Sequence, residues 1–271
     1  MTNNGYIINL HLLEKCNYYC KHCFARFDSY KQLSAQDWKR IIDNITEKTH
    51  VCRFNMAGGE PLLYQGLDEL IEYINAKDIQ VSLITNGYLL SEERIRRFKR
   101  RLSMVGISID ALHAGVLREM GRCTKKQEIL SMNRCIALCK SIKENDIQLK
   151  INTVVTRLNL HENMSNFIQT VCPDRWKILK MKQFSSGDND NFDLEITEDE
   201  FNKFCSMYTS VPHIEEPSLK NAYIMVDSNG CLVDNSSENN QPVVNLLQED
   251  FVKGFDALHL DKKLYESRYN I

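Results

Sequence analysis

The sequence has no excess of positive charge. Its 271 residues carry 34 Lys and Arg against 36 Asp and Glu, which gives a formal net charge of −2. Proteins that bind nucleic acids nonspecifically present a strongly basic surface. The balance therefore disfavours nucleic acid as a partner, but it leaves room for a local basic pocket.

Long apolar runs are also missing. No segment approaches the roughly 20 apolar residues that a membrane-spanning helix needs. The first residues, MTNNGYIINLHLLEKC, lack the basic flank and apolar core of an export signal. We therefore expect a cytoplasmic protein, a monomer, that does not associate with a membrane.

Cysteine, in contrast, is abundant, with ten residues in the chain. Without an export signal a disulfide framework is disfavoured, and metal or redox chemistry explains the cysteines better. Only Cys16, Cys20 and Cys23 form a tight cluster of three in the sequence. The scattered ones are Cys52, Cys123, Cys135, Cys139, Cys172, Cys205 and Cys231.

Short β-branched runs alternate with amphipathic segments, a pattern that is typical of βα units on a parallel sheet. Strands are predicted at 6–13, 51–57, 79–85, 104–109, 148–156 and 175–183. Helices are predicted at 35–48, 65–76, 92–102, 125–145 and 161–171, with Ser34 and Ser91 as caps of the first and third. Six such units predict an α/β fold, a partial (βα)6 TIM-like barrel over residues 1–184.

The rhythm changes after residue 184. A polar stretch leads to Thr197 and Glu200, a capping-box pattern that opens a helix at 198–209. The stretch 221–235 reads as a hairpin around a Ser-Asn-Gly turn. We predict that 185–271 form a C-terminal extension that packs on the barrel and closes its substrate site, with loop 185–195 as a lid.

The three clustered cysteines follow the first predicted strand, where parallel-sheet enzymes place their chemistry. Three thiols within eight residues can hold one face of a metal cluster. A zinc site with His22 as the fourth ligand is the alternative. Zinc sites usually combine two short ligand pairs, and the sequence offers no second pair.

The C-x₃-C-x₂-C spacing, followed by Gly-Gly-Glu-Pro at 58–61, resembles the radical S-adenosylmethionine (SAM) superfamily. The resemblance implies that Cys16, Cys20 and Cys23 bind three irons of a 4Fe–4S cluster, and that SAM chelates the fourth. It also implies a set of SAM-binding residues. These are Gly58, Gly59, Glu60, Pro61, Thr85, Asn86, Ser108 and Arg122.

Four cations sit on alternating strand positions that can share the inner face of the barrel. They are Arg53, Lys150, Arg175 and Lys177. If they point inward, an anion must accompany them, because unpaired buried charges are prohibitive. A triphosphate would supply that charge. The alternative is that these side chains face outward into solvent.

A closer resemblance is to the viperin family, specifically its prokaryotic relatives. It rests on LKINTVVTRLNLHENM with the later RWK, on N-x₆-C-N-Y-x-C, on R-x-N-x₂-GGEP and on AYIMVDSNGCLVDN. The resemblance spans about residues 6 to 265. It implies an enzyme of antiviral defence that acts on CTP, UTP or GTP.

In that family a 5′-deoxyadenosyl radical abstracts the ribose 4′ hydrogen, and the 3′-hydroxyl leaves as water. The product is the 3′-deoxy-3′,4′-didehydro nucleotide, and an external flavodoxin- or ferredoxin-like protein supplies electrons. The resemblance assigns Asn9, Arg53, Lys150, Asn152, Arg175 and Lys177 to the nucleoside triphosphate. The alternatives are a radical SAM enzyme for another metabolite or a peptide, and a non-enzymatic iron–sulfur sensor.

Overall fold

Six parallel strands, adjacent in chain order, form the body of the protein. The computed structural model describes residues 5–25, 32–186 and 189–269. The six strands are β1 (Tyr6–His11), β2 (Val51–Ala57), β3 (Gln80–Thr85), β4 (Met104–Ser108), β5 (Gln148–Val155) and β6 (Arg175–Lys180). Each lies at a predicted strand position, so the predicted partial (βα)6 barrel is confirmed.

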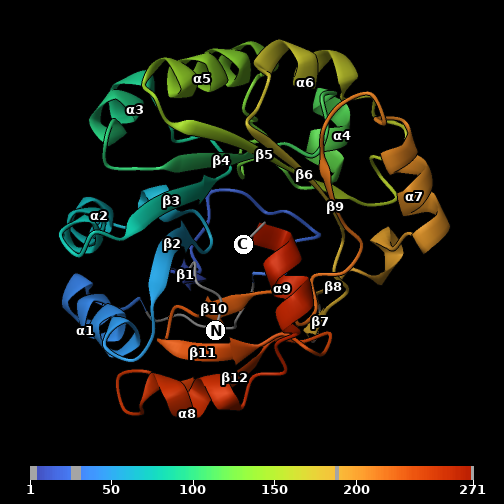
Figure 1. The fold of residues 1–271 in the computed structure, drawn as a ribbon. Helices are drawn as coiled ribbons and strands as arrows, with labels where there is room; N and C mark the ends of the chain where they lie inside the picture. The colour runs from blue at the N-terminus through green and yellow to red at the C-terminus, as the bar shows by residue number, and fades with distance from the viewer. Residues whose placement is uncertain (1–4, 26–31, 187–188, 270–271) are drawn as a thin grey trace.

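Helices cover the outer face of this curved sheet (Figure 1). They are α1 (Ala35–Thr46), α2 (Leu67–Asn75), α3 (Glu92–Phe98), α5 (Met132–Glu144) and α6 (Ser165–Val171). Ser34 and Ser91 cap α1 and α3 as predicted, since their hydroxyls accept from the backbone amides of Asp37 and Arg94. No helix in the described parts of the chain has the length and apolarity to cross a bilayer.

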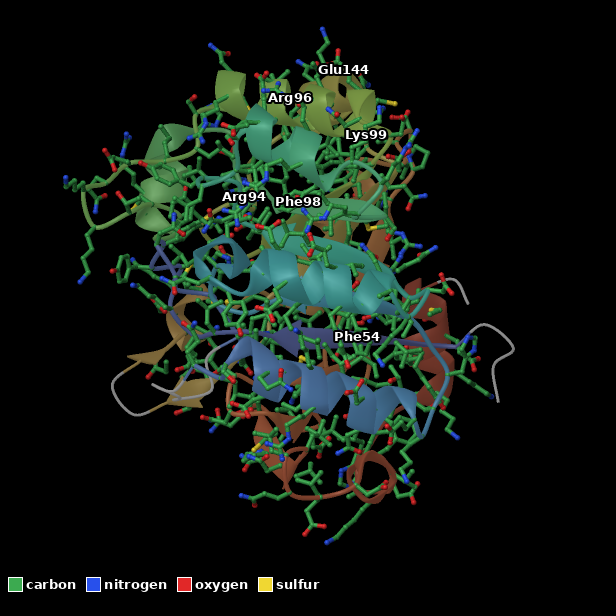
Figure 2. The ribbon with its side chains drawn as sticks, turned by 90° about the vertical axis from the view of Figure 1, so that its left-hand side faces the viewer. Phe54, Arg94, Arg96, Phe98, Lys99 and Glu144 are labelled. Atoms are coloured by element: carbon green, nitrogen blue, oxygen red, sulfur yellow. The ribbon has the colours of Figure 1, made fainter. Side chains whose placement is uncertain are left out.

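Side chains of these helices divide cleanly between core and solvent. Phe98 of α3 and Phe54 of β2 are fully buried between helices and sheet, whereas Arg96, Lys99 and Glu144 point outward (Figure 2). This apolar layer lies outside the barrel. The inner face of the strands is therefore left for polar side chains.

The prediction of one helix over 125–145 is wrong at its start. The helix begins at Met132, because the Thr124 hydroxyl accepts from the backbone amides of Lys126 and Glu128 and closes a turn. Gln127 in this turn has a positive φ of 62°. A short helix before it, α4 (Ala114–Glu119), was not predicted.

The chain after residue 184 adds strands at both edges of the barrel sheet. β9 (Ile214–Glu216) pairs in parallel with β6, and β10 (Ile224–Val226) pairs in parallel with β1. β11 (Cys231–Asp234) then pairs antiparallel with β10, which confirms the predicted hairpin. β12 (Gln241–Asn245) completes a ten-stranded sheet.

The remaining elements of the extension are short. The two-stranded sheet β7 (Ser185–Ser186) and β8 (Asn189–Asp190) precedes α7 (Glu198–Ser206), which starts with the predicted Thr197–Glu200 capping box. α8 (Phe251–Asp256) packs near β11 and β12. α9 (Lys262–Tyr269) lies inside the ring of helices and strands (Figure 1).

The Tyr265 side chain fastens α9 to the first strand. Its hydroxyl accepts from the Ile7 backbone amide at 2.6 Å and donates to the Ile7 carbonyl at 3.0 Å. These bonds coincide with the irregular pairing of β1 and β2 between Tyr6 and Ile7. The tyrosine thus satisfies backbone groups of a strand whose ladder is interrupted there.

The substitution Tyr265→Phe will destabilise the protein, because it leaves a buried amide and carbonyl without a partner. We expect a cost of about 1–3 kcal/mol, which lowers the Tm by roughly 2–10 °C. Thermal unfolding followed by circular dichroism measures it. Tyr19→Phe, at a side chain that is 48% exposed, is the control, and equal Tm values for the two variants would contradict the assignment.

Candidate active site

A cavity lies within the barrel, between the inner face of the strands and the loop that follows β1. We call it the barrel cavity. Its lining combines residues predicted for cluster, cofactor and substrate: Asn9, Cys16, Cys20, Cys23, Gly58, Gly59, Thr85, Asn86, Ser108, Arg122, Lys150, Asn152 and Lys177. Arg53, Glu60, Pro61 and Arg175 were also predicted but are not among its lining residues.

The loop after β1 carries the three cysteines to one end of this cavity. Backbone bonds hold the loop against its neighbours, since the amides of Tyr19 and Lys21 donate to the carbonyls of Gly121 and Met120. Burial raises the pKa of Cys16 to about 11 and that of Cys20 to about 12. A thiolate at either position therefore needs positive charge nearby.

Gly58 and Gly59 allow the end of β2 to approach the cysteine loop closely. The amide of Gly59 donates to the Leu13 carbonyl, and that of Glu60 donates to the Lys15 carbonyl. A Cβ at Gly59 would overlap the carbonyl oxygens of Glu14 and Lys15. Gly58 has a φ of +129°, which other residues rarely adopt.

The Glu60 carboxylate lies behind the cavity wall and organises the end of β3. It is fully buried and accepts from the Thr85 hydroxyl at 2.7 Å and from the backbone amides of Asn86 at 2.9 Å and Leu62 at 3.1 Å. Burial raises the pKa of Glu60 in spite of these donors. Glu60 thus restrains the Thr85 side chain and the Asn86 backbone, and both residues line the cavity.

Arg122 sits in a buried network with Asp110 and Cys20. Its Nε is 3.1 Å from Asp110 Oδ2, one Nη is 3.6 Å from Cys20 Sγ, and the other donates to the Ser108 carbonyl. Burial opposes a charge on Arg122, but Asp110 and Cys20 outweigh it and raise the pKa of the guanidinium. The arginine thus places a lasting positive charge beside a cluster cysteine.

The zinc alternative does not fit the positions of its ligands. His22 Nε2 lies 3.1 Å from Asp110 Oδ2, and its Nδ1 has no hydrogen-bond partner among the described residues, so the histidine alone does not decide against zinc. The sulfur atoms of Cys16, Cys20 and Cys23 are not gathered within 4.8 Å of one another. Ligands that are each about 2.3 Å from one zinc ion would lie closer together.

The register of the sheet sets the depth of the polar side chains in the cavity. Asn152 on β5 lies opposite Ser108 on β4 and Lys177 on β6. Lys150 and Arg175 face each other two residues nearer the amino ends of their strands. Lys150 and Arg175 thus lie deeper in the barrel than Asn152, whereas Lys177 lies at the same level as Asn152.

The inward orientation is confirmed for Lys150 and Lys177, which line the cavity. Burial holds the pKa of Lys150 well below its usual range, and the charges of Lys177, Arg175 and Arg53 lower it further. Glu216 opposes this shift. Arg53 and Arg175 are therefore close enough to act on the cavity although they do not line it.

Lys177 has an acidic partner that no motif or spacing in the sequence indicated. Glu216 on β9, fully buried, pairs with the Lys177 ammonium and accepts from the Tyr223 hydroxyl. Burial would raise the pKa of Glu216, but Lys177 and Arg268 outweigh it and lower the pKa. The Lys177 ammonium also lies 5.3 Å from the ring centroid of Tyr269 on α9.

The two predicted asparagines differ in how far their side chains are satisfied. Asn9 donates to the Ile224 carbonyl and to Tyr269, and accepts from Asn55 at 2.8 Å. The buried Oδ1 atom of Asn152 has no hydrogen-bond partner among the described residues. An unpartnered polar atom on a cavity wall is what a bound ligand would satisfy.

Comparison with known proteins shows the family to which this chain belongs. The family model described as the radical SAM superfamily matches residues 10–171. An "S-adenosylmethionine-dependent nucleotide dehydratase" of Selenomonas ruminantium is 36% identical over 98% of this chain and 99% of its own length. The chain belongs to the radical SAM superfamily and to this dehydratase family.

Further relatives carry the same name. A dehydratase of Flammeovirga pacifica is 29% identical over 93% of this chain and 90% of its own length. The "S-adenosylmethionine-dependent nucleotide dehydratase RSAD2" of Siniperca chuatsi is 24% identical over 96% of this chain and 77% of its own length. The viperin-like resemblance of the sequence is thereby confirmed.

Solved radical SAM structures share the fold at low sequence identity. "Native anSMEcpe with bound AdoMet and Cp18Cys peptide" matches with a TM-score of 0.72 at 15% identity, covering 96% of this chain and 82% of that one. Streptococcus suis SuiB bound to S-adenosylmethionine matches at 0.68 and 16%, covering 97% and 67%. These likenesses concern the fold alone.

The cofactors of this radical SAM protein are a 4Fe–4S cluster and SAM, and the residues present fit them. Three thiols line one end of the cavity, and Arg122 places positive charge beside Cys20. Burial disfavours their thiolates unless further positive charge is present, and iron supplies it. Iron–sulfur clusters are held by such cysteine thiolates.

Gly59→Ala will prevent normal loading of the cluster. The added Cβ meets backbone carbonyls of the cysteine loop, which cannot rotate away as a side chain could. After anaerobic reconstitution we expect the iron content per chain to fall by at least about half, since rigid backbone must shift. Gly115→Ala, with no atom within 4 Å of the new Cβ, is the control. Full iron content in Gly59→Ala would refute this role of the glycine.

Proposed function

We propose that the protein converts a nucleoside triphosphate, CTP, UTP or GTP, to its 3′-deoxy-3′,4′-didehydro analogue. The ribose loses its 4′ hydrogen atom, and the 3′-hydroxyl leaves as water after uptake of one electron and one proton. The observation that carries the proposal is the group of four cations at or near the cavity. Lys177 is buried, and Lys150, Arg53 and Arg175 are half-buried. A role in antiviral defence accords with the viperin-like family.

Cys16, Cys20 and Cys23 would hold the cluster, with Arg122 compensating charge at Cys20. SAM would lie along the ends of β2, β3 and β4, against Gly58, Gly59, Thr85, Asn86 and Ser108. Glu60 and Pro61 would act from behind the wall, because the Glu60 carboxylate is already used by three donors. When bound, the two cofactors supply the 5′-deoxyadenosyl radical that removes the ribose hydrogen.

The triphosphate would occupy the deep end of the cavity. Lys150 lines it there, and Lys177 lines the cavity at the level of Asn152. Arg53 and Arg175 add positive charge from nearby. A triphosphate would relieve the mutual repulsion that lowers the pKa of Lys150. Peptides and nucleobases carry no comparable charge, which disfavours them as substrates.

The register then fixes where the ribose would lie. With the phosphates beside Lys150 and the cluster beyond the carboxyl ends of the strands, the sugar falls near Asn152 and Ser108. Asn152 Oδ1 would accept a hydrogen bond from a ribose hydroxyl. Anchoring at both sides converts a loose encounter into an oriented one, which is the protein's main contribution to catalysis.

In the ligand-free protein the Glu216 carboxylate would take the place of the triphosphate as the anion beside Lys177. Its pairing with Lys177 partly neutralises the cations until the triphosphate arrives, and binding must then redistribute that contact. The C-terminal extension supplies Glu216, Tyr223 and Tyr269 to this region. We propose that 185–271 thereby close the substrate site around the barrel of 1–184. Of the proposed lid, loop 185–195, residues 187 and 188 lie outside the described residues.

Anaerobic turnover with dithionite, SAM and the four common nucleoside triphosphates in competition tests the proposal. We expect 5′-deoxyadenosine formation to depend on a triphosphate. Mass spectrometry should identify a product that is one water lighter than that triphosphate. Arg175→Ala should lower kcat/KM at least about tenfold, the effect of losing roughly 1.4 kcal/mol. Lys140→Ala, at an exposed cation on α5, is the control.

Two outcomes of that assay would refute the proposal. Formation of 5′-deoxyadenosine that no nucleotide stimulates would favour another substrate, and none under any condition would favour a non-enzymatic sensor. A flavodoxin- or ferredoxin-like protein should replace dithionite, since the reaction consumes an external electron.

Lys150→Met will stabilise the ligand-free protein while it weakens nucleotide binding. The substitution replaces a half-buried cation with an apolar side chain of similar length, and we expect a Tm at pH 7 higher by at least about 2 °C. The pKa of Lys150 is lowered in the fold, so the unfolded chain binds more protons between that value and the ordinary one of about 10.4. The free energy of unfolding of the wild type therefore rises with pH in this window. The difference in Tm between Lys150→Met and the wild type should then become smaller as the pH rises.

Thermal unfolding between pH 7 and pH 9, with and without CTP, measures both effects. The nucleotide-induced rise in Tm should be smaller in the variant than in wild type. A lower Tm than wild type at pH 7, together with an undiminished CTP effect, would show that Lys150 is not a desolvated substrate cation.

A further inference from the structure

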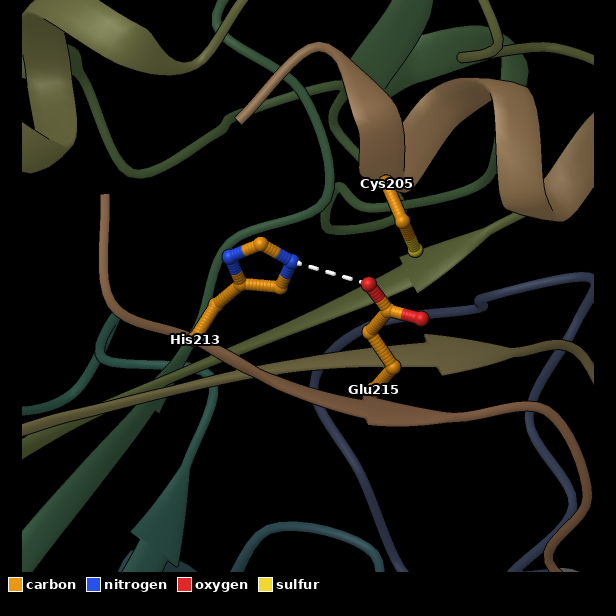
Figure 3. A group of neighbouring side chains, drawn as sticks. All are labelled: Cys205, His213 and Glu215. Carbon is orange, nitrogen blue, oxygen red and sulfur yellow. Dashed lines mark hydrogen bonds and ion pairs between the residues drawn. The ribbon is translucent and has the colours of Figure 1, made fainter. Parts of the chain in front are cut away.

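Away from the barrel cavity, three potential metal ligands converge between α7 and β9. They are Cys205 on α7, His213 just before β9, and Glu215 on β9 (Figure 3). One ligand atom from each lies within 4.8 Å of the other two. The Cys205 thiol points from the helix toward the Glu215 carboxylate, and the His213 ring faces the same carboxylate.

The hydrogen bonds of His213 leave one ring nitrogen facing an acceptor. Its Nδ1 lies 2.7 Å from the Val211 carbonyl, which can only accept, so Nδ1 carries the proton. In the neutral ring Nε2 then presents a lone pair, 3.1 Å from Glu215 Oε1. Two acceptors at this distance need a cation between them, either a second ring proton or a metal ion.

The Cys205 thiol favours a metal ion over a proton as the cation between His213 Nε2 and Glu215 Oε1. A thiol adds nothing to an imidazolium–carboxylate pair, whereas sulfur, nitrogen and oxygen together form a borderline-soft ligand set that suits zinc. The bond from Nδ1 to a backbone carbonyl is the second-shell contact that orients metal-binding histidines. Packing of the His213 ring against Trp176, with centroids 5.7 Å apart, restrains the ring further.

We propose that Cys205, His213 and Glu215 bind a zinc ion. Glu215 is 48% exposed, so water can reach the fourth coordination position. The ion joins α7 to the edge strand β9. The next residue on β9 is Glu216, which points the other way and pairs with Lys177. Zinc thereby stabilises the strand that carries the acidic partner of the barrel cavity.

Metal analysis of the iron-loaded protein tests this site separately from the proposed reaction. After removal of loosely bound metal and dialysis against buffered Zn²⁺, we expect about one zinc per chain, with iron unchanged. Cys205→Ser should lose this zinc, and Cys172→Ser, at an exposed cysteine, should keep it. Zinc should also raise the Tm of wild type and of Cys172→Ser, because it binds only the folded site.

Glu215→Gln covers the case in which the buried Cys205→Ser variant does not fold. This conservative change at a partly exposed side chain should weaken zinc affinity at least about tenfold, with iron content intact. Equal zinc content and affinity in wild type and Glu215→Gln would overturn the proposal, as would a wild-type protein that binds no zinc. In the latter case the group is an ion pair of protonated His213 with Glu215.

Discussion

Burial of like charges inside the barrel is the constraint on which the rest of the structure depends. Four cations project toward or lie close to one cavity, and low local polarity makes their mutual repulsion costly. The Glu216 carboxylate pairs with Lys177, and two tyrosine rings lie close to the Lys177 ammonium, which offsets part of this repulsion. The compensation is partial. Because the cations are only partly neutralised, the cavity favours binding of a highly charged anion. The same repulsion lowers the stability of the protein when no anion is bound.

The other end of the cavity has a complementary arrangement. There the potential charges are thiolates, and Arg122 is held beside them by Asp110. Asp110 in turn engages His22, the residue before the third cysteine. The cavity thus separates positive charge at depth from sulfur ligands at the mouth. A substrate with a phosphate end and a neutral sugar matches that polarity in one orientation only.

The C-terminal segment connects these features to the sheet. Because β9 joins one edge of the barrel and β10 the other, the extension contributes side chains to the cavity as strands of the same sheet. Glu216 comes from β9, whereas Asn9 bonds to the Ile224 carbonyl of β10 and to Tyr269 of α9. The zinc site that we propose would restrain β9 from its outer side.

Most local elements and the family resemblance of the site could be predicted from the amino-acid sequence alone. Short β-branched runs between amphipathic segments located all six barrel strands, because such side chains favour a strand that is buried against helices. Cysteine spacing and Gly-Gly-Glu-Pro carried the resemblance to the radical SAM superfamily, and that resemblance implied the cofactors. The helix over 125–145 was misplaced, because a Thr124 turn competes with helix formation in a way that periodicity does not record.

Which charged side chains pair depends on how distant segments pack together. Glu216 lies 39 residues from Lys177 in the chain, and nothing local marks it as a partner. Glu60 matched a cofactor motif, yet folding directs its carboxylate to Thr85 and Asn86 behind the wall. Cys205, His213 and Glu215 look like scattered residues until α7 packs beside β9. Ion pairs and metal ligands depend on distances between elements, and those are fixed by packing of the whole chain rather than by any segment of it.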